Sequence, residues 1–254
     1  MDVALAGLEE LLPFVAVGFA AQLVDGALGM AFGAIANTML VAMLGVPPAH
    51  ASYKVHVIKC FTAAASGMSH FIAGNVDVPL LLRLALFGVI GGALGAYGLS
   101  QIEAEAVRPF VLAYLMLLGA YLLYRGIRGG MERHEPRLAS PLGLVGGFLD
   151  AIGGGGWGPV VSSNLLVQGA MPRKVVGTVN CAEFFVAIAI SAAFLAHFGV
   201  EAIAGATLGL LIGGILAAPA GALVARFLPA RIMLTLVGFV LSVTSAAGIL
   251  AALA

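Results

Sequence analysis

Charged residues are scarce in this chain: Asp, Glu, Lys and Arg make up 9% of its 254 residues, while hydrophobic residues make up 61%. A soluble domain carries about 25% charged residues, so this chain lacks the polar surface that water requires. Twelve basic and twelve acidic residues cancel to a net charge of zero, which by itself says little about partners, and nucleic acid is not an expected ligand. The composition, with a mean hydropathy of +1.10, predicts an integral membrane protein surrounded by lipid.

Cysteines and enzyme motifs are also lacking. The two cysteines, Cys60 and Cys181, lie in apolar segments, where buried thiols are commoner than disulfides or metal ligands. The sequence contains no Gly-x-Ser-x-Gly elbow, no His-Glu-x-x-His zinc site and no phosphate-binding loop that ends in Gly-Lys-Ser/Thr. We therefore predict no cofactor, no metal site and no enzyme activity.

Eight apolar segments follow one another and form two sets of four. They cover roughly 11–45, 51–73, 79–99, 107–124, 140–169, 175–198, 202–224 and 231–253. The polar stretch between the sets is rich in arginine, with Arg125, Arg128, Arg133 and Arg137. We predict a first transmembrane repeat over 1–124, a linker over 125–139 and a second repeat over 140–254.

The two sets resemble each other when one is shifted by 125 residues without a gap. The matched pairs are Gly18 and Gly143, Asp25 and Asp150, Gly29 and Gly154, Gly33 and Gly158, Pro47 and Pro172, and Ser66 and Ser191. Two unrelated apolar helices share leucines and alanines by chance, but not such a frame of aspartate, glycine and proline. The chain is therefore a duplicated unit.

The first and fifth segments, 11–45 and 140–169, are longer than the about 20 residues that cross a bilayer, and their centres are rich in glycine. Each is either a re-entrant or broken hairpin or a long kinked span. If all eight segments span, the basic residues divide five against five between the two sides. If these two return to their own side, nine gather on one side: Arg83, Arg125, Arg128, Arg133, Arg137, Arg173, Lys174, Arg226 and Arg231.

Lys and Arg collect on the cytoplasmic side of membrane proteins, so the uneven division favours the hairpins. One hairpin and three spans per repeat give an odd number of crossings, and the two halves are then inverted in the membrane. The predicted fold is all-α, with two inverted repeats, each a broken helical hairpin followed by three transmembrane helices. The linker over 125–139 is expected in the cytoplasm of a multi-pass protein of the inner cell membrane.

A helix restarts after each glycine-rich turn, at Ala34 and at Pro159. Unpaired N–H groups at such helix starts, together with the backbone of the turns, favour an anion near the midplane. The candidate binding residues at the turns are Gly29, Gly154, Gly155, Asn37 and Asn164. The alternative is that the glycines only permit close helix packing.

A polar stripe runs along the second segment, where His56, Lys59, Ser66 and His70 recur at helical spacing. An ionisable group inside a membrane is a functional candidate, so Lys59 is the best candidate to neutralise a bound anion, with His56 and Ser66 beside it. We expect His70, near the end of this segment, to be solvated. Lys54 either binds substrate or reaches the outer interface.

The corresponding segment of the second repeat also contains polar residues at helical spacing, Asn180 and Glu183. Asn180 is a candidate ligand. Glu183 either pairs with Lys59 or takes up a coupling proton. Asp25 and Asp150, at the ends of the incoming half-helices, either hold the turns by accepting backbone N–H bonds or handle substrate and protons.

These residues resemble the sulfite exporter TauE/SafE family of membrane proteins over nearly the whole chain. The resemblance rests on the glycine-rich turns, on Pro47-Pro48 and Pro172, and on Ser69-His70 followed by Gly74-Asn75-Val76-Asp77. It implies transport of a sulfur-containing anion such as sulfite, sulfate or a sulfonate. The first turn departs from the family, because it has Leu28-Gly29-Met30-Ala31 where a fuller Gly-Gly-Gly is common.

The prediction is a secondary transporter of a small sulfur-containing anion (sulfite, sulfate, thiosulfate or sulfonate), coupled to protons, with the substrate between the two hairpin tips. A passive anion channel is the alternative, and a membrane enzyme acting through Cys60 or Cys181 is a third reading. The sequence leaves the preferred anion, the direction of transport, the coupling ion and a homodimeric state undecided.

Overall fold

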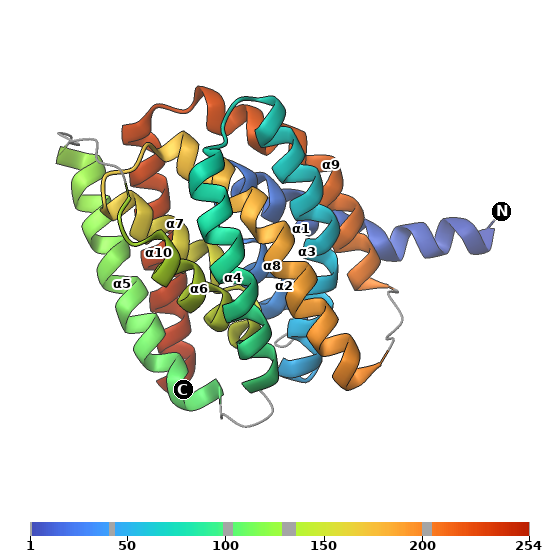
Figure 1. The fold of residues 1–254 in the computed structure, drawn as a ribbon. Coiled ribbons are helices and arrows are strands. Elements are labelled where there is room, and N and C mark those ends of the chain that lie inside the picture. Colours follow the sequence, from blue (N-terminus) through green and yellow to red (C-terminus); the bar gives the residue numbers. More distant parts are fainter. Residues whose placement is uncertain (1, 41–43, 99–103, 129–135, 200–204, 254) are drawn as a thin grey trace.

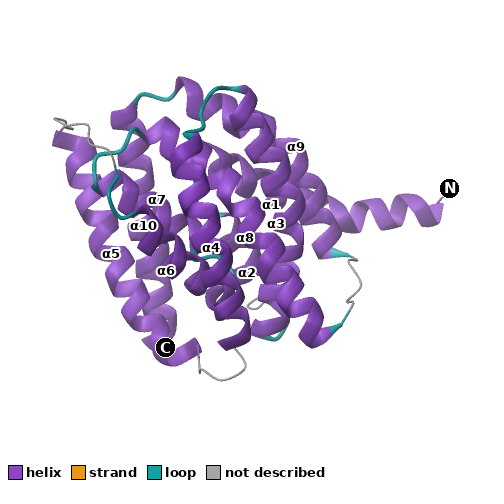
Figure 2. Ribbon diagram, in the orientation of Figure 1, coloured by secondary structure: helices purple, strands orange, loops and turns teal. Residues whose placement is uncertain are grey.

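The computed structural model describes residues 2–40, 44–98, 104–128, 136–199 and 205–253, and these residues form ten helices and no strand (Figures 1 and 2). The first half contains α1 (Asp2–Leu28), α2 (Phe32–Thr38), α3 (Pro48–Ile72), α4 (Val78–Gly98) and α5 (Ala104–Arg128). The second half contains α6 (Ala139–Gly153), α7 (Trp157–Val167), α8 (Pro172–Phe198), α9 (Ala206–Phe227) and α10 (Ala230–Leu253).

Five of these helices are long and apolar enough to cross a membrane, namely α1 from Leu11, α4, α8, α9 and α10. Their outer faces are suited to lipid. On α4, the side chains of Leu82, Leu86 and Leu94 are exposed at helical spacing, whereas Leu84 and Gly88 on the opposite face are buried. Such an exposed apolar stripe is unfavourable in water and favourable in a bilayer. The predicted all-α integral membrane fold is confirmed.

The first and fifth apolar segments are each broken into two helices. The breaks lie at 29–31, between α1 and α2, and at 154–156, between α6 and α7. Gly29 and Gly154 have φ angles of +74° and +66°, a left-handed conformation that glycine adopts without steric cost. The matched glycines of the duplicated sequence therefore end the two incoming helices in the same way.

The end of α7 lies close to the start of α6. The side-chain oxygen of Gln168, after α7, accepts hydrogen bonds from the backbone N–H groups of Arg137 and Leu138, at 3.0 and 3.3 Å. Arg125, at the end of α5, also donates to the carbonyl of Val167 at 3.5 Å. Helices α6 and α7 thus form a hairpin whose two ends meet.

Helices of one half pack against the other half in the same way as their counterparts do. Helix α1 packs on α9, and its counterpart α6 packs on α4; α3 packs on α8, and α5 packs on α10. Glycines permit both approaches, because a Cβ on Gly18 would lie 2.4 Å from the Leu210 carbonyl oxygen and one on Gly143 would lie 2.9 Å from that of Leu84. This correspondence is what a two-fold relation between the halves produces. The inverted orientation of the halves in a membrane stays a prediction.

Basic residues lie at one end of the helices, drawn uppermost in Figure 1. Arg231 Nε, on α10, donates to the Gly126 carbonyl of α5 at 2.9 Å. Lys174 Nζ donates to two carbonyls of the loop between α3 and α4, at 3.1 and 2.9 Å. Asn75 of that loop donates to the Ala222 carbonyl of α9 at 3.1 Å. We call this the basic end; it holds Arg125, Arg137, Arg173, Lys174, Arg226 and Arg231.

The predicted linker over 125–139 is only partly described. Helix α5 continues to Arg128 and α6 begins at Ala139, while 129–135, with Arg133, lie outside the described residues. The repeat boundary therefore stays a prediction.

Candidate functional site

Each helix break is held by an aspartate at equivalent positions. The Phe32 N–H, at the start of α2, donates to Asp25 Oδ1 at 3.2 Å, and the Trp157 N–H, at the start of α7, donates to Asp150 Oδ1 at 2.9 Å. A carboxylate that accepts the first N–H of a helix also interacts favourably with the partial positive charge at the helix N-terminus. Both aspartates thus have the turn-holding contact, and the first N–H of each outgoing helix is bonded to a side chain of the protein itself.

The two hairpin tips touch each other. A Cβ added to Gly33 would lie 2.6 Å from Gly155 Cα, and one added to Gly155 would lie 2.5 Å from the Ala34 nitrogen. The tips also exchange hydrogen bonds: Ser162 Oγ donates to the Gly29 carbonyl at 2.8 Å, and Asn37 Nδ2 donates to the Gly153 carbonyl at 3.1 Å. Gly33 and Gly155 therefore permit close packing. Asn37 and Ser162, which are equivalent under the 125-residue shift, each bond the opposite turn.

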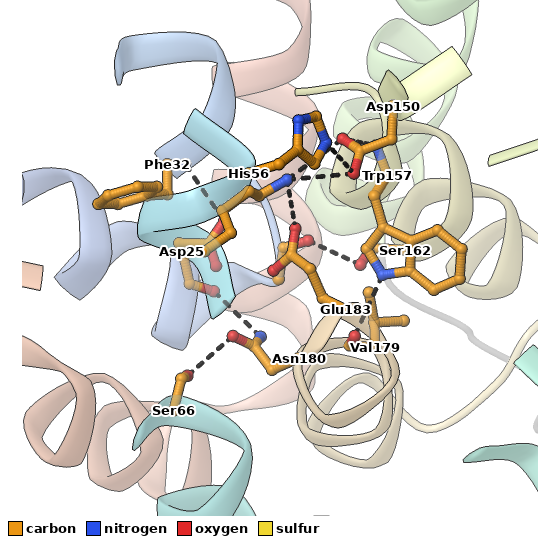
Figure 3. A network of polar contacts seen from close by, with 12 residues as sticks. Asp25, Phe32, His56, Ser66, Asp150, Trp157, Ser162, Val179, Asn180 and Glu183 are labelled. Atoms are coloured by element: carbon orange, nitrogen blue, oxygen red, sulfur yellow. Dashed lines mark hydrogen bonds and ion pairs between the residues drawn. The ribbon is translucent and has the colours of Figure 1, made fainter. Parts of the chain in front are cut away.

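A charged cluster lies beside these tips, and α3, α6 and α8 supply it (Figure 3). Lys59 Nζ is 2.7 Å from Glu183 Oε1 and 3.2 and 3.3 Å from the two carboxylate oxygens of Asp150. His56 Nε2 is 3.1 Å from Asp150 Oδ2. The four side chains are buried, with exposed fractions of 2% for Lys59, 5% for Glu183 and 0% for Asp150 and His56. We call Lys59, His56, Asp150 and Glu183 the quartet.

Hydrogen-bond geometry constrains the protons of the His56–Asp150 pair. His56 Nδ1 is 2.7 Å from the Ser52 carbonyl, which only accepts, so Nδ1 carries a proton. The Ser52 hydroxyl does not reverse this, because it donates to the Ala151 carbonyl at 2.8 Å. His56 Nε2 then faces Asp150 Oδ2, and one of these two atoms must also hold a proton. With Lys59 charged and Glu183 ionised, the quartet is neutral whichever atom holds it.

The Lys59 ammonium also lies at the first tip. A Cβ on Gly33 would be 3.2 Å from Lys59 Nζ and 2.9 Å from the Gly154 carbonyl oxygen. The cation therefore meets both glycine-rich turns as well as two carboxylates. Among the described residues no group of three or more His, Cys, Asp or Glu side chains is arranged to hold a metal ion.

Comparisons with known proteins show the family of this chain. A family model described as "Sulfite exporter TauE/SafE" matches residues 14–248, which is nearly the whole chain. The chain belongs to the TauE/SafE family. This TauE/SafE protein is 41% identical to "Probable membrane transporter protein YtnM" of Bacillus subtilis (strain 168), over 94% of this chain and 82% of that protein. It is 25% identical to "Probable membrane transporter protein YunE" of the same organism, over 44% of this chain and 41% of that protein. No solved structure matches it significantly.

The TauE/SafE protein is thus a multi-pass membrane transporter and not an enzyme, as the sequence predicted. The reading as an enzyme that acts through its cysteines is set aside. Cys60 Sγ is 3.4 Å from Ser191 Oγ, and Cys181 Sγ donates to the Gly67 carbonyl at 3.1 Å. Both thiols join α3 to α8.

The remaining predicted ligands of this transporter bond backbone groups or one another. Ser66 Oγ donates to Asn180 Oδ1 at 2.8 Å, and Asn180 Nδ2 donates to the Asp25 carbonyl at 3.4 Å. These two residues therefore attach α3 and α8 to the first turn. Asn164 Nδ2 donates to the Val160 carbonyl, one turn earlier in α7, at 2.6 Å. Their roles as substrate ligands stay predictions.

The expectation for His70 was wrong. Helix α3 continues to Ile72, and the His70 side chain is fully buried rather than solvated. Its Nε2 donates to the Gly26 carbonyl at 2.8 Å, and its Nδ1 accepts from Asn75 Nδ2 at 3.1 Å. The following loop packs against α9 through Asn75, and this contact covers the imidazole.

Sequence reasoning missed Ser52. Its hydroxyl joins α3 to the second turn at Ala151, and its carbonyl orients His56. Ser52 lies four residues before His56, so extending the polar stripe by one helical turn would have found it.

Proposed function

We propose that the protein is a secondary transporter of a small sulfur-containing anion, such as sulfite, sulfate, thiosulfate or a sulfonate, and that Lys59 binds this anion. One observation supports the proposal above others: a fully enclosed ammonium lies where the two broken helices touch. Broken helices of this kind form substrate sites in several transporter folds, because their turns offer backbone groups at membrane depth. The family description, which names sulfite, supports the class of substrate.

We also propose that the basic end is cytoplasmic and that the two repeats are inverted. The concentration of Arg and Lys at one end supports the first part. Contacts between the equivalent helices α3 and α8 support the second. Tyr53, near the start of α3, donates to the Gly199 carbonyl after α8, and Ser66, farther along α3, contacts Asn180, near the start of α8. The helices are therefore antiparallel, and a two-fold axis relating antiparallel spans lies in the membrane plane.

Proton coupling belongs to the same proposal. Asp25, Asp150 and Glu183 place three buried carboxylates around one lysine and one histidine. Buried charge must be paired or neutralised in a low-dielectric interior, so the site is suited to exchange protons when an anion arrives. Alternating access would follow from one repeat rocking against the other around the tips.

Uptake in proteoliposomes tests the transporter. Purified protein, offered labelled sulfite, sulfate, thiosulfate or methanesulfonate with and without an imposed pH gradient, is expected to give saturable uptake of one anion that the gradient accelerates. Flux that does not saturate and ignores the gradient would instead favour the anion channel, and uptake equal to empty liposomes for all four would reject an anion site.

Reporter fusions test the orientation. A reporter fused after Gly45, which follows the first hairpin, is expected to lie on the non-cytoplasmic side, with the N-terminus. A reporter fused after Gly74, at the basic end, is expected in the cytoplasm. Alkaline phosphatase, active outside, and green fluorescent protein, fluorescent inside, give opposite signals at the two positions. A cytoplasmic signal after Gly45 would mean that 11–45 crosses the membrane completely.

A further inference from the structure

We propose that Glu183 is a tethered competitor of the substrate: it binds Lys59 while the site is empty, and a proton releases it so that the substrate anion takes its place on Lys59. This inference rests on the anion site proposed above. It names one carboxylate out of three as the coupling group and predicts that one proton is taken up for each anion that binds.

The contacts of the two carboxylates on Lys59 differ. Asp150 also accepts the Trp157 N–H and contacts His56, so its position is held by the start of α7 and by α3. Within the described residues, Lys59 is the hydrogen-bonding partner of Glu183, at 2.7 Å. Glu183 is also the more exposed of the two side chains, at 5% against 0%. Loss of one contact frees Glu183, whereas Asp150 cannot leave without opening the second turn.

The third carboxylate, Asp25, is held at the first turn by the Phe32 N–H. Helices α1, α3, α4, α7, α9 and α10 pack against α8, and Asp150 near the end of α6 contacts Lys59. The charged or titratable groups that face Glu183 among the described residues are Lys59 and His56 from α3, Asp150 from α6 and Asp25 from α1. No further cation in this set is available to an incoming anion.

Charge conservation favours a proton as the releasing agent. When Lys59 and Glu183 are both ionised the quartet is neutral, because the hydrogen bonds of His56 make the His56–Asp150 pair neutral overall. If a monoanion binds Lys59 while Glu183 stays ionised, the buried cluster gains an uncompensated charge, which is costly away from water. If Glu183 instead binds one proton, the neutral acid leaves Lys59, the anion replaces its negative charge and the net charge of the cluster does not change. The anion and the proton enter together and leave together.

The Lys59–Glu183 pair occurs in only one of its two symmetry-related positions. Under the 125-residue shift, Lys59 corresponds to Phe184 and Glu183 corresponds to Ile58. The pair is therefore not repeated at the symmetry-related position, and each chain offers one lysine and one competing carboxylate. This predicts one anion per cycle.

Calorimetry on purified full-length protein tests the inference. Sulfate, thiosulfate and methanesulfonate are the probes, because their own charge does not change between pH 6 and pH 8. Over the range in which Glu183 is ionised in the empty protein, wild-type Kd is expected to rise about tenfold per pH unit for a monoanion, with one proton taken up. Repeating the titration in buffers of different ionisation enthalpy measures that proton directly.

The variant Glu183→Gln removes the competitor and keeps its size. It is expected to bind the same probe with a Kd that does not change with pH, more tightly than wild type at pH 8, and without proton uptake. Asp77→Asn, which neutralises a carboxylate at the start of α4 outside the cluster, is the matched control and is expected to keep the wild-type pH slope.

Other results of this experiment would overturn the inference. Binding by wild type without proton uptake overturns the inference, even if Glu183→Gln does not fold. Proton uptake that persists in Glu183→Gln, or weaker binding by this variant at pH 8, overturns it as well. If wild type binds none of these probes, and does not bind sulfite at pH 8 either, the proposed function is overturned, and the inference with it.

Discussion

Lys59→Met is expected to lower anion uptake at least a hundredfold while the protein still enters the membrane. Methionine retains the length and apolar character of the lysine side chain but removes the one ammonium of the quartet, which contacts Glu183 at 2.7 Å and Asp150 at 3.2 Å. A factor of 100 corresponds to about 2.7 kcal/mol, within the range for a truncated charged contact in a buried site. Uptake of the wild-type substrate in proteoliposomes measures the loss.

The controls separate binding from folding. Removing one partner of a buried ion pair costs about 3–5 kcal/mol if the orphan carboxylate stays charged, so Lys59→Met must be compared with wild type by size-exclusion chromatography as well. Arg83→Gln removes an exposed cation from α4, outside the quartet, and is expected to keep uptake within about twofold, in the range of an ordinary surface substitution. Full activity of Lys59→Met would remove Lys59 from the proposed site.

Asp150→Ala is expected to destabilise the protein far more than Asp25→Ala, although the two positions are equivalent in the duplicated sequence. Asp150 accepts the Trp157 N–H and also contacts His56 and Lys59, so its loss removes a partner from a helix start, from a buried histidine and from a buried lysine. We expect a cost of about 3–5 kcal/mol for Asp150→Ala. For Asp25→Ala, which removes the Phe32 N–H contact, we expect about 1 kcal/mol.

Thermal unfolding followed by fluorescence measures this difference. The chain contains a single tryptophan, Trp157, at the start of α7, so its emission reports on the second turn directly. The midpoint is expected to fall by several degrees more for Asp150→Ala than for Asp25→Ala. Asp150→Asn, which can still accept the Trp157 N–H, is expected to lie between them. Equal shifts for both alanine variants would show that the cation contacts of Asp150 add no stability.

Some features of the site were accessible from local sequence patterns. Glycines at 29 and 154 end the incoming helices because they adopt positive φ, and the aspartates four residues earlier lie one helical turn before those ends. Spacing of three along one helix places His56 and Lys59 on the same face. Turn conformation and helical periodicity depend on a few neighbouring residues, so a single sequence is enough to predict them.

Long-range contacts were harder to predict. Lys59 and Asp150 are 91 residues apart, and nothing in the local pattern distinguishes Asp150, which contacts Lys59, from its equivalent Asp25, which contacts the Phe32 N–H. The burial of His70 likewise depends on Asn75 and on a carbonyl of α9, 147 residues from Asn75. Such pairings follow from how α3 and the loop after it pack against α6 and α9.

The sequence by itself determined that the protein lies in a membrane and that its fifth apolar segment, like its first, is broken at glycine, and it predicts that these two segments belong to a duplicated unit. Composition, period and backbone freedom are local properties, and they act wherever the chain is placed. Only the tertiary structure decided which charges meet: it brought Lys59 between Glu183 and Asp150 and bonded the helix starts to aspartates of the chain itself. Electrostatic pairing depends on distance in space, and helix packing alone sets that distance.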